Sequence, residues 1–392
     1  MSHEQNEHIK PERDKSKDFF GSGIFDWQLI SHDLEATWRE RSYNEQRWWG
    51  DFPRDEKVPQ DMFKAFPWAI GPFTKHQPNP ILAPTPGAWD QGHSAGGVHN
   101  GSIIRHNGRF YYIYRGERPI DVAIKSEINY ICDVGLASSD DGIHFVKDSS
   151  HSPFFRKDQD RRYSYEDPCV VRYGDMFYLF CNQWFWDDML NPSLCGVFAA
   201  TSKDLYHWEK RGIVFPKAAR IHRNPVVLQN PDNEAVRING RFVMYINDGL
   251  MAYSDDMLRW ESTEISHRWP GGEGCFAVTG HDKERPDDLV LFTGGHHTGH
   301  FYAVGEVLFS TADPEKPIAW LPRPVLAADK KFPYEDGFSA DQPHRFISCW
   351  ADTVFFTGMT RHNDKWLAYY GGSEYYTCLA SAPAKRSINT TK

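Results

Sequence analysis

The chain of 392 residues lacks any run of about 18 consecutive apolar residues, and its first residues carry charges without an apolar core segment. These absences argue against a membrane-spanning helix and a secretory leader, so we expect a cytoplasmic protein without membrane contact. Lys and Arg form no stripe, and the formal net charge is -9. Because nucleic acids bind to clustered cations, no nucleic-acid partner is expected.

Cysteine is too scattered to build a covalent framework. The seven cysteines are odd in number, and no two have the CxxC spacing of zinc or redox sites. Most lie in apolar stretches, where a reduced cysteine packs as a small hydrophobic side chain. The sequence also lacks a Walker loop and a GxGxxG motif after a strand. We therefore expect neither a metal nor a cofactor.

The sequence does contain an internal repeat. A polar turn followed by an aromatic-rich strand occurs five times, and three copies continue into a Ser/Asp turn closed by Phe or Trp. The five copies are 107–116, 173–182, 239–248, 286–295 and 363–372, and the three continuations are 137–145, 200–208 and 252–260. An isolated antiparallel sheet cannot bury both faces, so repeated sheets must pack on one another. The repeat predicts an all-β fold, a five-bladed β-propeller.

The repeat also predicts the domain organisation. Residues 1–70 form a polar and helical N-terminal extension, and 71–385 form the propeller, which we expect to be the catalytic domain. Within the extension, 26–52 carries apolar residues at partly helical spacing. Such a segment commonly braces a propeller or a partner subunit, so a homo-oligomer formed through the extension is compatible with the sequence. Aromatic residues, 15% of the chain, suit either blade packing or stacking on sugar rings.

The strongest local candidate for chemistry is RRYSYEDPCVV, which leads into the second repeat strand. Tyr165, Glu166 and Asp167 stand just before an apolar run that would form the inner strand of a blade. Asp167 is then expected to point toward the propeller axis, where loops converge on a shared pocket. The two adjacent acids before a proline can equally be a turn or cap pair.

Polar residues near the strands of all five predicted blades are further candidates. They are His99, Asn100 and Arg115 in the first blade, Asn182 and Trp184 in the second, Glu234 and Asp248 in the third, Glu273 in the fourth, and Tyr334, Glu335 and Asp336 in the fifth. Cleavage of a glycoside needs such a set, because one carboxylic acid protonates the leaving oxygen while a carboxylate activates water or attacks the sugar. Each of these acids also has a plain alternative as a solvated turn residue.

Three histidines lie close together in TGGHHTGH, at His296, His297 and His300. A metal site, hydrogen bonding of a sugar hydroxyl by His297, and an ordinary surface loop all fit this pattern. No cysteine or carboxylate accompanies the three at ligand spacing, so the pattern does not favour a metal.

With these residues in view, the chain resembles glycoside hydrolase family 130, five-bladed propeller enzymes that cleave β-mannosides by phosphorolysis or hydrolysis. The order of several short motifs carries the resemblance, which covers roughly 71–382. They are NPIL at 79–82, Trp89-Asp90, Asn100-Gly101-Ser102, Tyr114-Arg115, the turn at 137–145, Glu166-Asp167-Pro168, a stretch at 301–326 and the ending YYGGSEYYTCLASA.

The chain departs from the family pattern at three positions. Cys169, Thr293 and Arg237 stand where the family's phosphorylases carry Arg, His and Lys. Losing cationic or hydrogen-bonding groups weakens a phosphate site, because the dianion needs charge-assisted partners. The family's hydrolytic branch is similar in placing two glutamates there, and Glu234 and Glu273 fall in the matching blades.

The resemblance therefore implies an inverting glycosidase that acts on a short oligosaccharide, and a β-mannoside is the expected substrate. Asp167 would be the acid, and Glu234 or Glu273 the base, with carboxyl groups roughly 6.5 to 9.5 Å apart. The first alternative is a β-mannoside phosphorylase with Arg223, Arg237 and His297 as phosphate ligands. The second is a non-catalytic sugar-binding propeller, suggested by the Asn100 turn and by Cys169.

Overall fold

The computed structural model describes residues 57–92, 96–119, 130–155, 163–186, 192–215, 222–263, 273–297, 301–336 and 353–384. The helical segment expected at 26–52 lies outside these residues, and the domain boundary at residue 70 stays a prediction. In the described part of the chain, no helix has the length and apolar character needed to cross a bilayer.

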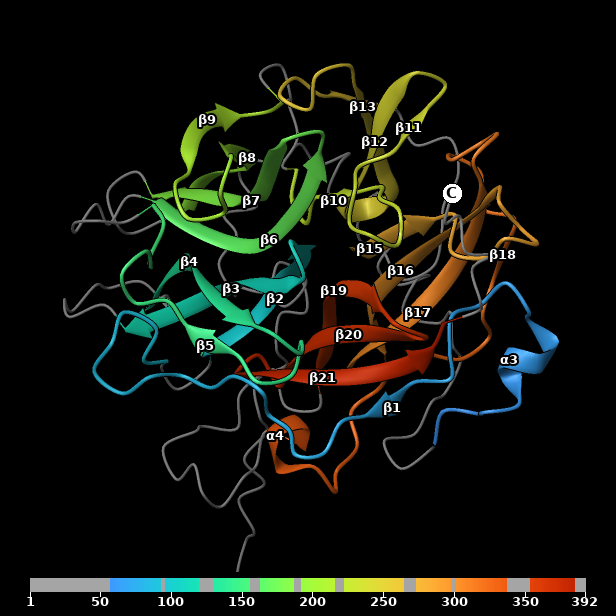
Figure 1. Ribbon diagram of the computed structural model, residues 1–392, viewed down its shortest axis with the longest axis horizontal. Coiled ribbons are helices and arrows are strands. Elements are labelled where there is room, and N and C mark those ends of the chain that lie inside the picture. Colours follow the sequence, from blue (N-terminus) through green and yellow to red (C-terminus); the bar gives the residue numbers. More distant parts are fainter. Residues whose placement is uncertain are drawn as a thin grey trace, which may run out of the picture.

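Five antiparallel sheets surround a central axis, which confirms the predicted all-β, five-bladed propeller (Figure 1). Blades one and two comprise β2 (Val98–His106), β3 (Arg109–Pro119), β4 (Tyr130–Ser139) and β5 (Val146–Lys147), then β6 (Tyr163–Tyr173), β7 (Met176–Trp186), β8 (Pro192–Ser202) and β9 (Glu209–Ile213). Blade three comprises β10 (Val226–Val227), β11 (Arg237–Ile238), β12 (Arg241–Ile246), β13 (Leu250–Ser254) and β14 (Glu261–Ser262).

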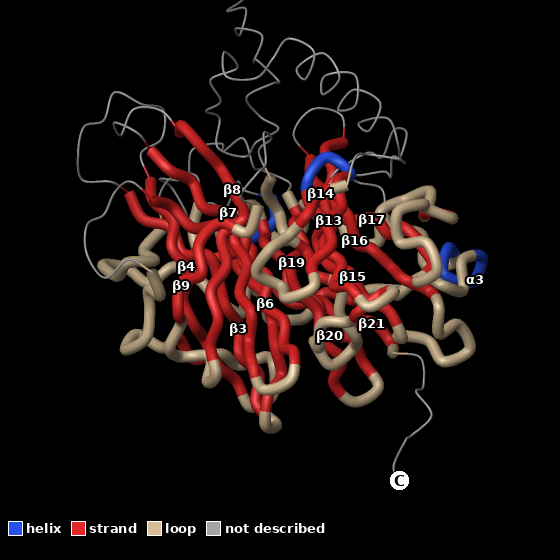
Figure 2. The backbone as a smooth tube through the Cα atoms, turned by 90° about the horizontal axis from the view of Figure 1, so that it is seen from above, coloured by secondary structure: helices blue, strands red, loops and turns tan. Residues whose placement is uncertain are grey.

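Blade four comprises β15 (Glu273–Thr279), β16 (Asp288–His297), β17 (Phe301–Ser310) and β18 (Ala319–Trp320), and blade five β19 (Val354–His362), β20 (Lys365–Gly372), β21 (Tyr376–Pro383) and β1 (Thr74–Lys75). The short helices among the described residues are α3 (Met62–Ala65), α4 (Pro333–Asp336) and the 3-10 turn η2 (Asn247–Gly249). Figure 2 shows the strands running between the two ends of the molecule, where loops join them. The pocket described below lies at one of these ends.

The repeated Asn-Gly pairs form the hairpins. In blade one, His106 pairs with Arg109, so Asn107 and Gly108 form a two-residue loop, and both have positive φ angles of 51° and 78°. A two-residue loop of this kind matches the twist of the flanking strands, and Asn and Gly tolerate its left-handed backbone. The same loop recurs at 239–240 in blade three. Turn chemistry therefore explains why the repeat is visible in the sequence.

Apolar side chains join each blade to the next. Ile104 and Val134 of blade one are fully buried against Val170 and Leu179 of blade two. Four further clusters fill the remaining junctions, including the one between blades five and one. The aromatic residue that ends the Ser/Asp turn also packs in these junctions. The ring of Trp260 lies edge-on to the ring of Phe180 in blade two, with 5.9 Å between the ring centroids.

The N-terminal strand closes the propeller. In Figure 1, β1 lies beside β21, and Thr74 pairs with Ser381. Next to this junction, Lys75 Nζ lies 2.5 Å from Oε2 of Glu335, whose side chain is fully buried. The Tyr370 hydroxyl donates to the other oxygen of Glu335 at 2.8 Å. Glu335 thus ties α4 to the first and last parts of the propeller.

Removing the cation of this junction is expected to destabilise the protein. In Lys75→Met, Glu335 loses the amine that offsets its burial, and breaking a buried pair costs about 3–5 kcal/mol. Burial raises the pKa of Glu335, and Lys75 opposes that rise. Without Lys75, the folded protein holds the acid neutral, so the stability loss should grow as the pH rises above the unfolded pKa of glutamate.

The measurement is urea unfolding of both proteins between pH 5 and pH 8. Lys331→Met is the matched control, because Lys331 pairs with Asp329 on an exposed surface and should change stability by less than about 0.5 kcal/mol. Equal stability of the Lys75 and Lys331 variants would contradict a role for the pair in closure.

Candidate active site

The inner strands share an irregularity at the same level of the propeller. Their pairing register shifts between His99 and Ser102 in β2, Glu166 and Cys169 in β6, Gly274 and Phe276 in β15, and Phe356 and Gly358 in β19. In blades one to three, Asn100, Asp167 and Asn224 adopt positive φ angles of 45°, 50° and 53°. Such bulges re-aim side chains, and left-handed non-glycine residues cluster at functional sites.

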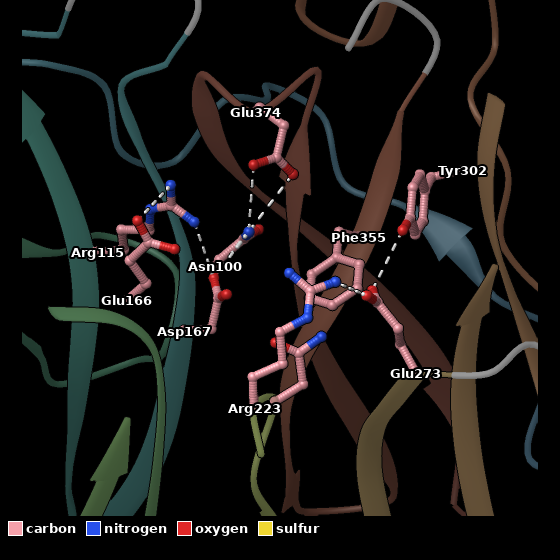
Figure 3. A pocket seen from close by; sticks show the side chains of 10 residues that line it. Asn100, Arg115, Glu166, Asp167, Arg223, Glu273, Tyr302, Phe355 and Glu374 are labelled. Carbon is pink, nitrogen blue, oxygen red and sulfur yellow. Dashed lines mark hydrogen bonds and ion pairs between the residues drawn. The ribbon is translucent and has the colours of Figure 1, made fainter. Parts of the chain in front are cut away.

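All five blades contribute to one pocket at this level (Figure 3). Its lining residues are Asn100 and Arg115, Glu166 and Asp167, Arg223 and Asn224, Glu273 and Tyr302, and Phe355 and Glu374, for blades one to five in turn. Polar groups that converge on the axis from separate blades are the arrangement expected of a ligand site.

Asp167 is held by three nitrogen donors. Asn100 Nδ2 and Arg115 Nη1 donate to Oδ1 at 3.1 and 3.2 Å, and Asn182 Nδ2 donates to Oδ2 at 2.9 Å. Asn182 is fully buried, and its own oxygen accepts the backbone N–H of Asn224 at 2.7 Å. The carboxyl group therefore has a defined orientation, with donors from two blades.

Glu166 lies beside Asp167 and is bound from behind. Trp184 Nε1 donates to Oε2 at 3.0 Å, and Arg115 Nη2 lies 3.5 Å from Oε1. Burial raises the pKa of Glu166, Arg115 lowers it, and the neighbouring Asp167 raises it further. Burial and the neighbouring charge therefore favour the protonated form of Glu166 more than water would.

Blades three and four form the other side of the pocket. Arg223 donates through Nη2 to Oε1 of Glu273, and the Tyr302 hydroxyl donates to Oε2 at 3.3 Å. Burial raises the pKa of Tyr302 well above its ordinary value, and the charge of Glu273 adds to the rise. Figure 3 shows this group facing Asp167 and Asn100, with Phe355 beside it.

Glu374 completes the pocket from the turn between β20 and β21. Asn100 Nδ2 lies 3.4 Å from each of its oxygens, so this amide contacts both Glu374 and Asp167. Burial raises the pKa of Glu374, while His99 and Arg115 lower it. The sequence motif YYGGSE ends on this residue, and that motif was the signal that could have identified it.

The structure brings together half of the side chains predicted from the sequence. Asn100, Arg115, Glu166, Asp167 and Glu273 line the pocket. His99, Asn182 and Trp184 are buried one layer behind it, where they contact Glu374, Asp167 and Glu166 respectively. The expected separation of Asp167 and Glu273 stays a prediction.

Glu234 was wrongly predicted to face the pocket. It forms an ion pair with Arg172 at 2.7 Å, near the end of β6 that is roughly 15 Å along the strand from Asp167. Its loop, 230–235, crosses the opposite end of the propeller. There, Asn233 donates to the backbone oxygen of Met359 at 2.9 Å, and Arg172 N–H donates to the Asn233 oxygen at 2.9 Å. The loop therefore contacts blades two and five at this end.

Three further candidates do not line the pocket, and their contact with a substrate stays a prediction. Tyr165 packs between blades one and two, with its ring 4.8 Å from that of Phe155. Tyr334 stacks on Phe332 in α4, and Glu335 serves the closure junction. Strand alternation points the Tyr165 side chain away from the axis. Tyr334 and Glu335 lie on α4, where Phe332 contacts the first and Lys75 and Tyr370 contact the second.

The phosphate ligands named for the alternative have different outcomes. Arg223 lines the pocket, but Arg237 is exposed, donates to the backbone oxygens of Gly240 and Asp255, and lies over the ring of Phe242. The side chains of Asp248, His296, His297, His300 and Asp336 lie outside the described part of the structure. Asn224, Tyr302, Phe355 and Glu374 were not predicted.

Comparisons with known proteins add to this geometry. No family model matches the chain. The chain is 27% identical to a 1,2-beta-oligomannan phosphorylase from Thermoanaerobacter sp. (strain X514), over 75% of the chain and 92% of that protein. It is 24% identical to a beta-1,2-mannobiose phosphorylase from the same strain, over 79% of the chain and 96% of that protein.

A solved structure has the same fold. The description of that structure states that the GH130 family of mannoside phosphorylases contains glycoside hydrolases that target beta-1,2 mannosidic linkages in Candida mannan. The TM-score is 0.65 at 22% identity, and the match covers 85% of this chain and 98% of that one. The resemblance of the chain to glycoside hydrolase family 130 is confirmed.

Proposed function

We propose that the pocket cleaves a β-mannosidic linkage in a short oligosaccharide, and that inorganic phosphate is the group that attacks the sugar. The observation that carries the proposal is the placement of Asp167 and Arg223 in one pocket, an acid facing a guanidinium. The two curated relatives, both named as phosphorylases of β-1,2-linked mannosides, favour phosphate over water as the attacking group.

Asp167 is the proposed proton donor. Protonation of the glycosidic oxygen, directly or through a sugar hydroxyl, allows the bond between the anomeric carbon and that oxygen to break. Phosphate attacks the anomeric carbon from the opposite face, so a β-mannoside gives an α-linked sugar 1-phosphate and a shortened oligosaccharide. Asn100, Arg115 and Asn182 hold the carboxyl group in place for this step.

Arg223 is the proposed phosphate ligand. Guanidinium groups bind phosphate through charge-assisted hydrogen bonds, and a buried site strengthens them. Its partner Glu273 is a carboxylate, which repels the dianion. The hydroxyl of hydrogen phosphate can donate a hydrogen bond to Glu273, and this contact offsets part of the repulsion.

The remaining lining residues suit a sugar. Glu374 and Glu166 accept hydrogen bonds from hydroxyl groups, and the Phe355 ring offers an apolar face for a pyranose. We propose that these three contact the mannosyl group whose anomeric carbon reacts.

Hydrolysis is the second candidate, and one observation favours it. Glu273 lines the pocket on the side that faces Asp167, where a carboxylate can activate water for inversion. Because the Glu234 side chain is at the opposite end of the propeller, Glu273 is the base in this alternative.

Product analysis decides between these reactions. We expect β-1,2-mannobiose and longer β-mannosides to yield a sugar 1-phosphate only when inorganic phosphate is present. Release of free mannose at the same rate without phosphate would establish hydrolysis instead. Binding of the oligosaccharides without cleavage under either condition would identify a sugar-binding propeller and overturn both enzymatic proposals.

A further inference from the structure

His99 lies between two carboxylates that come from different blades. Its ring is fully buried. Nε2 lies 3.0 Å from Oε1 of Glu117 on β3, and Nδ1 lies 3.3 Å from Oε2 of Glu374 on the turn between β20 and β21. The next residue, Asn100, holds the same Glu374 through its amide. His99 therefore links the first blade to a carboxylate of the pocket.

Both ring nitrogens lie within ion-pair distance of carboxylate oxygens, with hydrogen-bond geometry at Nε2 and a charge contact at Nδ1. An imidazolium is the form of the ring that pairs with both acids. A neutral imidazole donates through one nitrogen only, so its other nitrogen would face a carboxylate with lone pair against lone pair. An imidazolium donates through both. In the alternative, the ring is neutral and one of the two acids carries the proton, so the cluster holds the same number of protons.

The charges around the ring favour the imidazolium. Among the described residues, the groups facing His99 are the carboxylates of Glu117 and Glu374 and the guanidinium of Arg115. Burial lowers the pKa of His99, but Glu374 and Glu117 raise it more than burial and Arg115 lower it, so the net change is upward. Arg115 also serves Glu166 and Asp167, which lie beyond it. A second cation is therefore needed on this side of the pocket.

We propose that His99 is a positioning residue that holds Glu374 toward the pocket as a carboxylate, acting as an imidazolium bound between two acids. The contact of Glu374 with the sugar rests on the proposed function. The link between His99 and Glu374 rests on the geometry alone. Loss of the proton from His99 releases Glu374, so sugar binding weakens as the pH rises through the raised pKa of His99.

Two substitutions separate the contacts of the ring. In His99→Asn, the amide nitrogen takes the place of Nδ1 and keeps a donor for Glu374. In His99→Gln, it takes the place of Nε2 and keeps a donor for Glu117. We expect His99→Gln to raise the KM for the oligosaccharide by about tenfold and His99→Asn by less than about threefold, with the KM for phosphate unchanged in both. We expect kcat/KM of the parent protein to decline at alkaline pH, and both variants should lose this decline.

A second measurement does not depend on any substrate. Histidine carbon resonances report the titration of each ring, and the His99 signal is identified by its absence in His99→Asn. Glu374→Gln should lower the pKa of His99, whereas Glu234→Gln, at the other end of the propeller, should leave it unchanged.

Two results would overturn the inference, namely equal effects of the two His99 variants on the oligosaccharide KM, or a His99 titration that ignores Glu374→Gln. If the protein cleaves no β-mannoside but the titration responds to Glu374→Gln, then the proposed function fails while the positioning role stands.

Discussion

Asp167→Asn is expected to lower the rate of mannoside cleavage by about 10³-fold, because an amide cannot supply the proton that the leaving oxygen needs. The amide keeps the size of the carboxyl group, and its oxygen can still accept from Asn100 and Arg115, although its nitrogen then faces the Nδ2 donor of Asn182. Binding of the oligosaccharide should change much less than turnover, which places the loss in the chemical step. Initial rates over a range of oligosaccharide concentrations provide both values.

The control for this variant is Glu234→Gln. Sequence reasoning assigned Glu234 to the same chemistry, but the structure pairs it with Arg172 at the end of β6 that is away from the pocket. Its activity should lie within about twofold of the parent, since surface changes away from the site have small effects. Thermal unfolding of both variants checks that the fold persists. A fully active Asp167→Asn variant, correctly folded, would remove Asp167 from the mechanism.

The second large effect is expected at the pair formed by Arg223 and Glu273. If Arg223 binds phosphate, Arg223→Met should lower kcat/KM for phosphate by about 10²-fold, a loss typical of one buried charge-assisted contact. Glu273→Gln should have the opposite sign, because it removes a carboxylate that repels the dianion while Arg223 stays in place. If phosphate is the attacking group, Glu273→Gln therefore keeps or raises the rate of phosphorolysis.

Hydrolysis predicts the reverse pattern. Glu273→Gln would then remove the base that activates water, and the rate would fall by about 10²–10⁴-fold. The two variants therefore distinguish the reactions by the direction of change as well as its size.

Stability needs separate control, because Arg223→Met takes the cationic partner from a buried acid and breaking such a pair costs about 3–5 kcal/mol. Arg223→Lys keeps the charge with a smaller loss. Arg211→Met, which breaks an exposed pair with Glu209, should leave both stability and activity unchanged. A folded Arg223→Met variant with an unaltered KM for phosphate would contradict the phosphate site.

The fold was predictable because local turn chemistry repeats along the chain. Each Asn-Gly pair adopts a two-residue loop whatever surrounds it, and the aromatic strands that follow must be covered on both faces. The closure by β1 was not predictable in the same way. Two residues, Thr74 and Lys75, carry too little pattern, and their partners lie about three hundred positions away along the chain.

The candidate site was predictable only in part. Asp167 and Glu166 stand in a compact acidic motif before an apolar strand, and the structure places both in the pocket. Tyr334 and Glu335 have an equally suggestive motif, yet they pack beneath blade five because Lys75 and Tyr370 meet them there. Contacts between residues so far apart along the chain depend on the closed propeller, which local patterns do not describe.

The amino-acid sequence by itself determined the number of blades, the hairpins and the presence of polar residues near the start of several inner strands, because propensities and short-range hydrogen bonds act within a few residues. Only the tertiary structure decided which acids meet. A bulge shared by four inner strands turns Asn100, Asp167 and their neighbours toward one axis, and strand alternation sends Tyr165 into the core. The pocket side chains meet only in the assembled propeller, because each blade alone supplies one wall of the pocket.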